Sequence, residues 1–151
     1  MPRFSKGFTL VELIAVMVIM SILATSVINS YSSYNKWQDI NEQVLDIVNT
    51  LRQARDYCMA ANEEFYLTVT TGATDSYTLK YKETKDDLFL PGKSGNVFTM
   101  PSYVDFTETT GLGAELEFDI LGQPGNGATI TINTDERTIN IVSPTGYIYA
   151  E

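Results

Sequence analysis

The fold of this chain is decided near its N-terminus by the stretch FTLVELIAVMVIMSILATSVI, residues 8–28, in which Glu12 is the one charged residue. A helix of this length is about 31 Å long at 1.5 Å per residue, which is close to the hydrocarbon thickness of a bilayer. A soluble domain of 151 residues does not bury so long an apolar helix on all its faces. The sequence therefore predicts a transmembrane helix over residues 8–28.

The charges on either side of this segment predict its orientation. Arg3 and Lys6 precede it, whereas acidic residues dominate the rest of a chain that has ten basic and nineteen acidic side chains and a net charge of −9. Positive flanks remain in the cytoplasm, so residues 1–6 are expected there and the remainder outside. A cleaved secretory signal is one alternative, but no A-x-A pattern follows the apolar run. A plain anchor is another, but an ionised Glu12 at membrane depth is costly and indicates a function.

The residues Gly7-Phe8-Thr9-Leu10-Val11-Glu12 resemble the processing signature of type IV pilins and type II secretion pseudopilins. The resemblance covers the basic leader, the signature and the apolar helix, up to about residue 28. It implies that a prepilin peptidase cleaves after Gly7, removes residues 1–7, and N-methylates Phe8. It also implies that Thr9, Leu10 and Glu12 contribute to processing and assembly, and that Arg3 and Lys6 supply the charge of the leader.

Elementary electrostatics supports a role for Glu12. Gly7 offers an unhindered peptide bond between the leader and the helix, and cleavage there creates a cationic amine on Phe8. Glu12 lies four residues later, about one helical turn away, so its carboxylate can pair with this amine or with that of a neighbouring subunit. Such pairing would help to set subunit register in a helical filament. The alternative is that Glu12 only extends toward the lipid headgroups.

Beyond the membrane segment, the pattern predicts that the helix continues through residues 29–62. Apolar residues spaced by three and four form one stripe, and there is no proline between residues 8 and 60. The stripe consists of Ile40, Val44, Ile47, Leu51, Ala54 and Cys58. This half of the helix is therefore expected to pack on a globular head formed by residues 63–151.

The head is predicted to consist of short strands joined by tight turns, which indicates an antiparallel sheet. The expected strands are 65–71, 77–81, 103–107, 115–121, 128–132, 137–142 and 147–150, with a loop over 82–96. The fold class is therefore α+β, with a long N-terminal helix laid on one antiparallel sheet, as in the pilin fold.

Two further segments carry a narrower resemblance. LRQARDYCMAAN, residues 51–62, and the hairpin-rich segment 118–150 resemble the H-type, or FimT-like, pseudopilins. Members of that subfamily are minor subunits near a filament tip. Some related proteins bind DNA through a basic C-terminal tail, but this chain has no basic residue after Arg137. The sequence therefore predicts no nucleic-acid partner.

Composition and motifs also weigh against catalysis, and no cofactor or metal is expected. The chain has no histidine and a single cysteine, Cys58, which excludes catalytic histidines and an internal disulfide. The segment Gly92-Lys93-Ser94 lacks the other features of a phosphate-binding loop. Glu115, Glu117 and Asp119 alternate along an expected strand and are predicted to form its solvated outer face. Calcium ligation by Asp86, Asp87 and Asn96 in the long loop is an alternative that the sequence leaves open.

The sequence thus predicts a structural, non-enzymatic minor pseudopilin of a type II secretion system. Its expected partners are other pilins or pseudopilins, the prepilin peptidase and methyltransferase, the assembly platform of the inner membrane, and lipid before assembly. The expected location is the bacterial inner membrane with a periplasmic head, followed by a pseudopilus or a cell-surface filament. A minor pilin of a type IV pilus and a membrane-tethered binding module that never polymerises are the alternatives.

Overall fold

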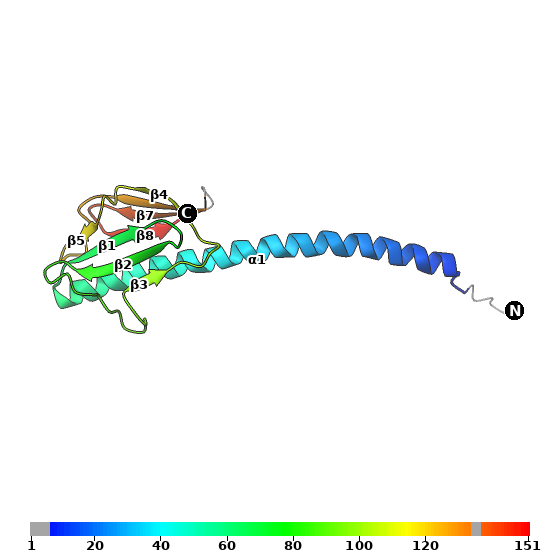
Figure 1. Cartoon of the computed structure of the whole chain (residues 1–151), viewed down its shortest axis with the longest axis horizontal. Coiled ribbons are helices and arrows are strands. Elements are labelled where there is room, and N and C mark those ends of the chain that lie inside the picture. Colours follow the sequence, from blue (N-terminus) through cyan, green and yellow to red (C-terminus); the bar gives the residue numbers. More distant parts are fainter. Residues whose placement is uncertain (1–6, 134–136) are drawn as a thin grey trace. The chain divides into compact units, whose positions relative to one another are not determined.

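A single helix, α1 (Leu10–Ala61), dominates the first part of the chain (Figure 1). The computed structural model describes residues 7–133 and 137–151, without the side chains of residues 26–30. The chain divides between Asp39 and Ile40 into two compact units. Within the described residues, no helix is both long and apolar enough to cross a membrane.

The C-terminal end of α1 follows from local backbone chemistry. Asn62 has a φ of 59°, a left-handed conformation that asparagine tolerates better than most residues. The N–H of Glu63 donates to the carbonyl of Cys58 at 2.9 Å, six residues back by inclusive count. This is the Schellman arrangement, which satisfies carbonyl groups that the ending helix leaves without partners.

Eight strands follow and form two antiparallel sheets of four strands each. Sheet A has the order β3-β2-β1-β5, and sheet B has the order β4-β6-β7-β8 (Figure 1). The strands are β1 (Phe65–Thr70), β2 (Ser76–Tyr81), β3 (Val97–Thr99), β4 (Phe106–Thr110), β5 (Leu116–Phe118), β6 (Ala128–Ile132), β7 (Arg137–Val142) and β8 (Tyr147–Ala150).

The α+β pilin-like class is confirmed, but the expectation of a single sheet is wrong. After β4 the chain leaves sheet B and adds β5 to the edge of sheet A. Gly111 and Gly113, with φ values of 78° and 61°, make this change of direction possible. Such φ values are strained for residues with a Cβ atom, and they interrupt the extended backbone between the two strands.

β1 and β2 match the expected strands to within one residue, whereas three other strands differ more from the sequence pattern. β3 is an additional strand, and β4 begins three residues later than expected because a turn joins Pro101 to Val104. β5 ends at Phe118 because the Asp119 carboxylate accepts the N–H groups of Leu121 and Gln123, which bends the chain. The last three strands, β6 to β8, have the predicted bounds.

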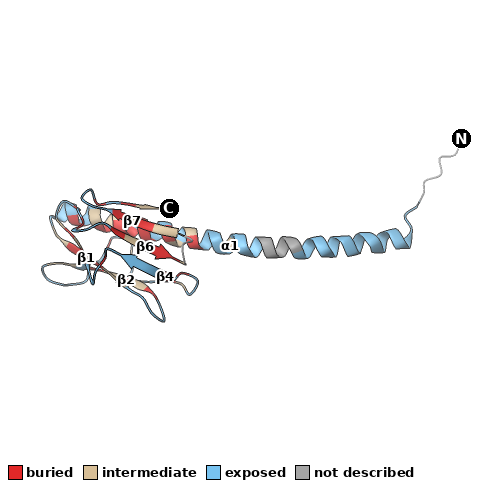
Figure 2. Ribbon diagram, turned by 90° about the horizontal axis from the view of Figure 1, so that it is seen from above, coloured by how far each residue is buried: buried red, intermediate tan, exposed pale blue. Residues whose placement is uncertain are grey.

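The core of the second unit lies where α1 and the two sheets meet (Figure 2). The predicted stripe from Ile40 to Cys58 is at most 3% exposed at each of its six positions. Sheet A contributes Phe65 and Phe118, whose rings stack at a centroid distance of 4.5 Å. Sheet B contributes a set of buried isoleucines, namely Ile130, Ile132, Ile139, Ile141 and Ile148.

Two arginines of α1 attach the helix to the last strand. The Arg52 guanidinium donates to the carbonyl of Ile148, with Nε 2.9 Å from the oxygen. Arg55 Nη1 donates to the carbonyl of Gly146 at 2.7 Å. Hydrogen bonds from charged donors are stronger than neutral ones, so these contacts fix β8 against α1.

Candidate functional site: the start of the helix

The first turn of α1 is held by a reciprocal pair of contacts between Thr9 and Glu12. The backbone N–H and the hydroxyl of Thr9 each lie 2.9 Å from Glu12 Oε2, and the N–H of Glu12 points back to Thr9 Oγ1 at 3.3 Å. This is a capping box, in which two side chains satisfy N–H groups that have no partner within the helix. It explains why α1 begins at Leu10.

The capping box is a feature that the sequence analysis missed. Its signal is present as Thr-x-x-Glu directly before an apolar run. The sequence pattern predicted for Glu12 a pairing with a terminal amine, or an extension toward the lipid headgroups, but no role as a helix cap. In the uncleaved chain its carboxylate already has partners on Thr9, so pairing with an amine would have to share or replace these contacts.

The predicted cleavage position lies just outside the helix. Gly7, Phe8 and Thr9 precede α1 and have no regular secondary structure. Apart from Gly7 and its chain neighbours, no atom of the described residues lies within 4 Å of a Cβ built on Gly7, and the Phe8 side chain is 83% exposed. The peptide bond between Gly7 and Phe8 is therefore not shielded by side chains on the Gly7 side. Arg3 and Lys6, the predicted leader charges, lie outside the described residues.

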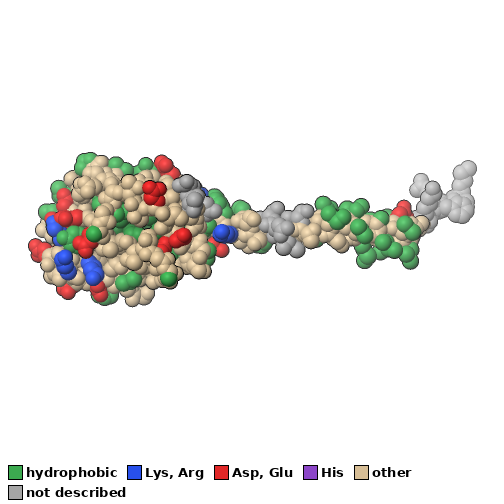
Figure 3. All heavy atoms as spheres, turned by 45° about the horizontal axis from the view of Figure 1, so that its top comes forward, with side chains coloured by type: hydrophobic (Ala, Val, Ile, Leu, Met, Phe, Trp, Pro, Cys, Tyr) green, Lys and Arg blue, Asp and Glu red, His purple; other side chains and the backbone are tan. Residues whose placement is uncertain are grey.

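The apolar side chains that follow are exposed within the first unit (Figure 3). Leu10 is 76% exposed, and Met20 is 67% exposed. The hydroxyls on this segment bond to their own helix, since Ser21 Oγ donates to the Met17 carbonyl at 2.7 Å and Thr25 Oγ1 donates to the Ile22 carbonyl at 2.7 Å. Hydroxyls satisfied in this way do not need water.

The polar residues singled out in the head have structural partners. Lys93 Nζ lies 2.7 Å from Asp46 Oδ1 on α1. Asn96 Nδ2 donates to Asp87 Oδ1 at 2.7 Å, near the bridge between Asp87 and Lys80. Among residues 7–133 and 137–151, no group of three or more Cys, Asp or Glu side chains is placed to hold a metal ion.

Glu117 on β5, one of the alternating acidic residues, also has a partner. Lys82 Nζ lies 2.6 Å from Glu64 Oε2 and also contacts Glu117 Oε1. Hydrogen bonds to Glu117 and Glu64 raise the pKa of Lys82 above its ordinary range. Glu117 is therefore half-buried in a three-residue ion cluster, whereas Glu115 is exposed as expected.

Cys58 behaves as a core residue. It is 1% exposed, and burial followed by the charge of Glu63 raises the pKa of its thiol to about 11. A thiol with such a pKa is almost fully protonated at neutral pH, and its nucleophilic form is scarce. The structure thus places Cys58 in the packing stripe predicted from its spacing.

Comparison with known proteins identifies the segment around this site. Residues 2–28 match the model of the prokaryotic N-terminal methylation motif. No curated protein and no solved structure matches the chain. The matched residues contain Gly7, Phe8 and the capping box, together with most of the exposed apolar segment. The chain therefore carries a type IV pilin-like prepilin signal at its N-terminus.

Proposed function

We propose that the chain is a structural subunit of a type IV pilin-like filament, and specifically a minor pseudopilin of a type II secretion system. The observation that carries the proposal is the match of residues 2–28 to the N-terminal methylation motif. The open bond after Gly7 and the exposed apolar helix that follows support the same function.

Processing is the first step of the proposed mechanism. A prepilin peptidase hydrolyses the bond between Gly7 and Phe8, so that a water molecule supplies the hydroxyl of the new carboxyl group and a proton for the new amine. The Phe8 amine is then methylated. Cleavage after Gly7 removes Arg3 and Lys6. All nineteen acidic residues therefore remain in the mature chain, with only eight of the ten basic ones.

Glu12 then changes partners. In the uncleaved chain its carboxylate caps the helix through Thr9. Cleavage places a cation one turn away at Phe8, and an opposite charge is a stronger partner for a carboxylate than a neutral hydroxyl. In a bundle of apolar helices an unpaired carboxylate is costly, so pairing with a terminal amine favours one register between subunits.

Residues 8–28 anchor the precursor in the inner membrane as a single-pass helix, and this segment includes residues 26–28, whose side chains the structure leaves undescribed. The exposed apolar side chains and the internally bonded Ser21 and Thr25 suit an environment without water. The head lies in the periplasm. The assembly platform then transfers the helix from lipid into the core of a filament, where other pseudopilins replace the lipid contacts.

Intact-mass analysis tests the processing step. The full chain is expressed in a bacterial membrane with and without a prepilin peptidase. The expected product has lost residues 1–7 and gained one methyl group at Phe8. A chain that keeps its leader in the presence of an active peptidase refutes the proposal and supports a tethered module that does not polymerise.

Two matched variants separate the roles of charge and cap. Glu12→Gln removes the charge, whereas Thr9→Val removes the capping hydroxyl and keeps the carboxylate. Both are expected to be cleaved, but only Glu12→Gln should lose most of its incorporation into filaments. Equal incorporation of Glu12→Gln and wild type would remove the pairing mechanism.

Deletion in the native host distinguishes the two filament systems, since loss of secretion indicates a pseudopilus and loss of pili indicates a minor pilin.

A further inference from the structure

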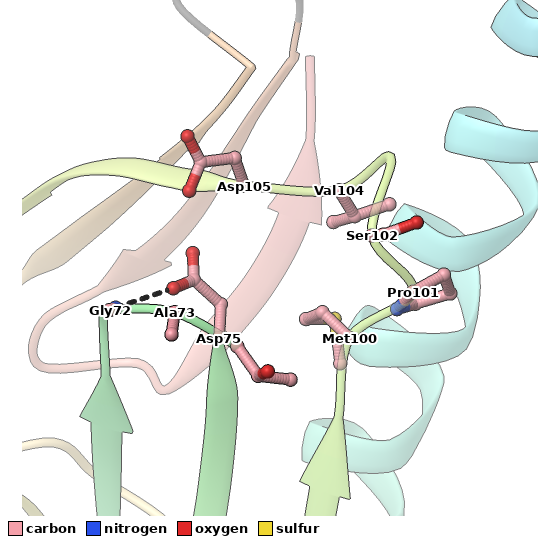
Figure 4. Close-up of a pocket in the computed structure, with 9 residues that line it drawn as sticks. Gly72, Ala73, Asp75, Met100, Pro101, Ser102, Val104 and Asp105 are labelled. Carbon is pink, nitrogen blue, oxygen red and sulfur yellow. Dashed lines mark hydrogen bonds between the residues drawn. The ribbon is translucent and has the colours of Figure 1, made fainter.

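Two carboxyl groups face each other where the two sheets of the head meet (Figure 4). Asp75 lies in the turn between β1 and β2 of sheet A and is 5% exposed. Asp105 directly precedes β4 of sheet B, and its side chain is exposed. Both line one cavity of about 230 Å³, which is bordered by the turn 72–75 and the segment that leads from β3 to β4.

Asp75 connects three parts of the head. Its Oδ1 accepts the N–H of Gly72 at 2.8 Å, and its Oδ2 accepts the N–H of Phe106, the first residue of β4. Its backbone carbonyl accepts the N–H of Met100 at 2.7 Å. One buried residue therefore ties the β1–β2 turn and the exit of β3 in sheet A to the start of sheet B.

The backbone of Asp105 is held in place beside this connection. Its N–H donates to Asn133 Oδ1 at 2.8 Å, and its carbonyl accepts the N–H of Asn133 at 2.9 Å. The backbone of Asp105 is thus anchored to the residue that follows β6, which places its side chain next to Asp75. In Figure 4 the two carboxyl groups lie on the same side of the cavity.

The local charges decide which carboxyl group holds a proton. Asp75 and Asp105 are the titratable side chains among the described residues of the cavity wall, and no described cation borders it. Asp135 and Glu136, which follow Asn133 closely in the sequence, lie outside the described residues. Both carboxylate oxygens of Asp75 accept a backbone N–H group, so Asp105 is the carboxyl group placed to donate between the two. The contact with Asp75, burial and the charge of Asp75, in that order, raise the pKa of Asp105.

We propose that Asp75 and Asp105 form a proton-dependent latch, in which protonated Asp105 donates a hydrogen bond to the Asp75 carboxylate and strengthens the junction between the two sheets. When Asp105 loses its proton, two negative charges face each other and the segment 100–105 opens more often. The latch controls the start of β4, which is an edge strand of sheet B.

The direction of the pH response follows from linkage. A carboxyl group with a raised pKa in the folded state binds its proton more tightly there than in the unfolded chain. The added stability is complete below the ordinary aspartate pKa of about 3.9, and it is lost as the pH rises through the higher folded pKa. Most surface carboxylates in ion pairs respond in the opposite direction, so the response of the latch is measured locally, at Asp105 and Phe106.

The test is a pH titration of the full chain in detergent micelles, followed by NMR of the side-chain carboxyl carbons and by amide hydrogen exchange. Asp105 should titrate above the ordinary aspartate range, and the Phe106 amide signal should shift with the same midpoint. Protection of the Phe106 amide, corrected for intrinsic exchange, should fall by roughly threefold or more from pH 4 to pH 7. An Asp105 carboxyl that titrates in the ordinary range overturns the proposal without any variant.

Asp105→Asn provides the matched variant, because an amide can donate to Asp75 at every pH. Its Phe106 protection should be independent of pH and equal to that of the acidic wild type. Glu108→Gln, an exposed carboxylate on the same strand, is the control and should leave the wild-type response unchanged. A pH response that persists in Asp105→Asn, or that disappears in Glu108→Gln, refutes the assignment to this pair.

Discussion

Replacement of Gly146 by alanine tests how closely the turn before β8 approaches the turn after β5. Gly146 has a φ of 64°. A Cβ built on it overlaps the carbonyl oxygen of Gly122, which is a backbone atom, and lies 3.4 Å from Cδ of Arg55. The added methyl group therefore cannot be accommodated by the rotation of a flexible side chain, and one of the two turns must move.

The magnitude follows from two contributions. A left-handed φ costs a residue with a Cβ about 1–2 kcal/mol. Movement of the turn also weakens the hydrogen bond from Arg55 to the Gly146 carbonyl, which is 2.7 Å long, and a bond from a charged donor is worth about 1.5–3 kcal/mol. Gly146→Ala should therefore lower the free energy of unfolding of the head by about 2.5–5 kcal/mol.

The matched control is Gly113→Ala. Gly113 has a similar φ of 61°, but no atom lies within 4 Å of its Cβ position. This variant should lose only the conformational contribution of about 1–2 kcal/mol. Urea unfolding of the full chain in detergent, followed by the near-ultraviolet circular dichroism of the tyrosines, measures both. Equal losses for the two variants would refute the close approach of the turns.

Three further predictions concern other contacts of the head. Arg52→Leu should lower the free energy of unfolding by about 1.5–3 kcal/mol, because the carbonyl of Ile148 loses a charged donor; an unchanged urea midpoint would contradict this. At pH 8, Cys58 should react with iodoacetamide more than ~100-fold slower than a free thiol, since its pKa is about 11 and it is buried; the urea-unfolded chain is the control, and fast labelling of the folded chain counts against the packing. Lys93→Met should cost less than about 1 kcal/mol, because its pair with Asp46 is partly exposed; a larger loss in the same urea assay would give this pair a greater role.

The helix and its packing face could be predicted because both follow from local properties. A 3.6-residue period identified the stripe that is buried from Ile40 to Cys58, and the absence of proline allowed a continuous helix. The bounds of β6, β7 and β8 were also predicted, since each is a β-prone run between strong turn residues such as Pro144 and Gly146.

The division into two sheets could not be predicted, because it depends on pairing between strands that are distant in sequence. β5 pairs with β1 rather than with β4, its predecessor along the chain. β4 is displaced because the Asp75 carboxylate and the turn at Pro101 determine where the extended backbone starts. Neither contact leaves a periodic signal in the sequence.

The candidate site was predicted in part. Gly7, Phe8 and Glu12 were named from their resemblance to a processing signature and lie within residues 2–28, which match the methylation motif; their individual roles stay predictions. The capping role of Thr9 and Glu12 was missed, although Thr-x-x-Glu is a local pattern that a helix N-terminus favours. Glu12 was interpreted only through its charge, and a carboxylate in the first turn of a helix can satisfy backbone groups as well.

The attachment of β8 to α1 has a consequence for crowded surroundings. A sheet with two open edges can pair with identical sheets edge to edge without limit. Arg52 occupies an outward carbonyl of β8, so a foreign strand must displace a guanidinium before it can pair there. β4 forms the other edge of sheet B, and two copies that join through this edge alone would form a closed pair instead of a growing ribbon. Arg52 thus hinders strand addition at one edge of sheet B when many heads are packed tightly together.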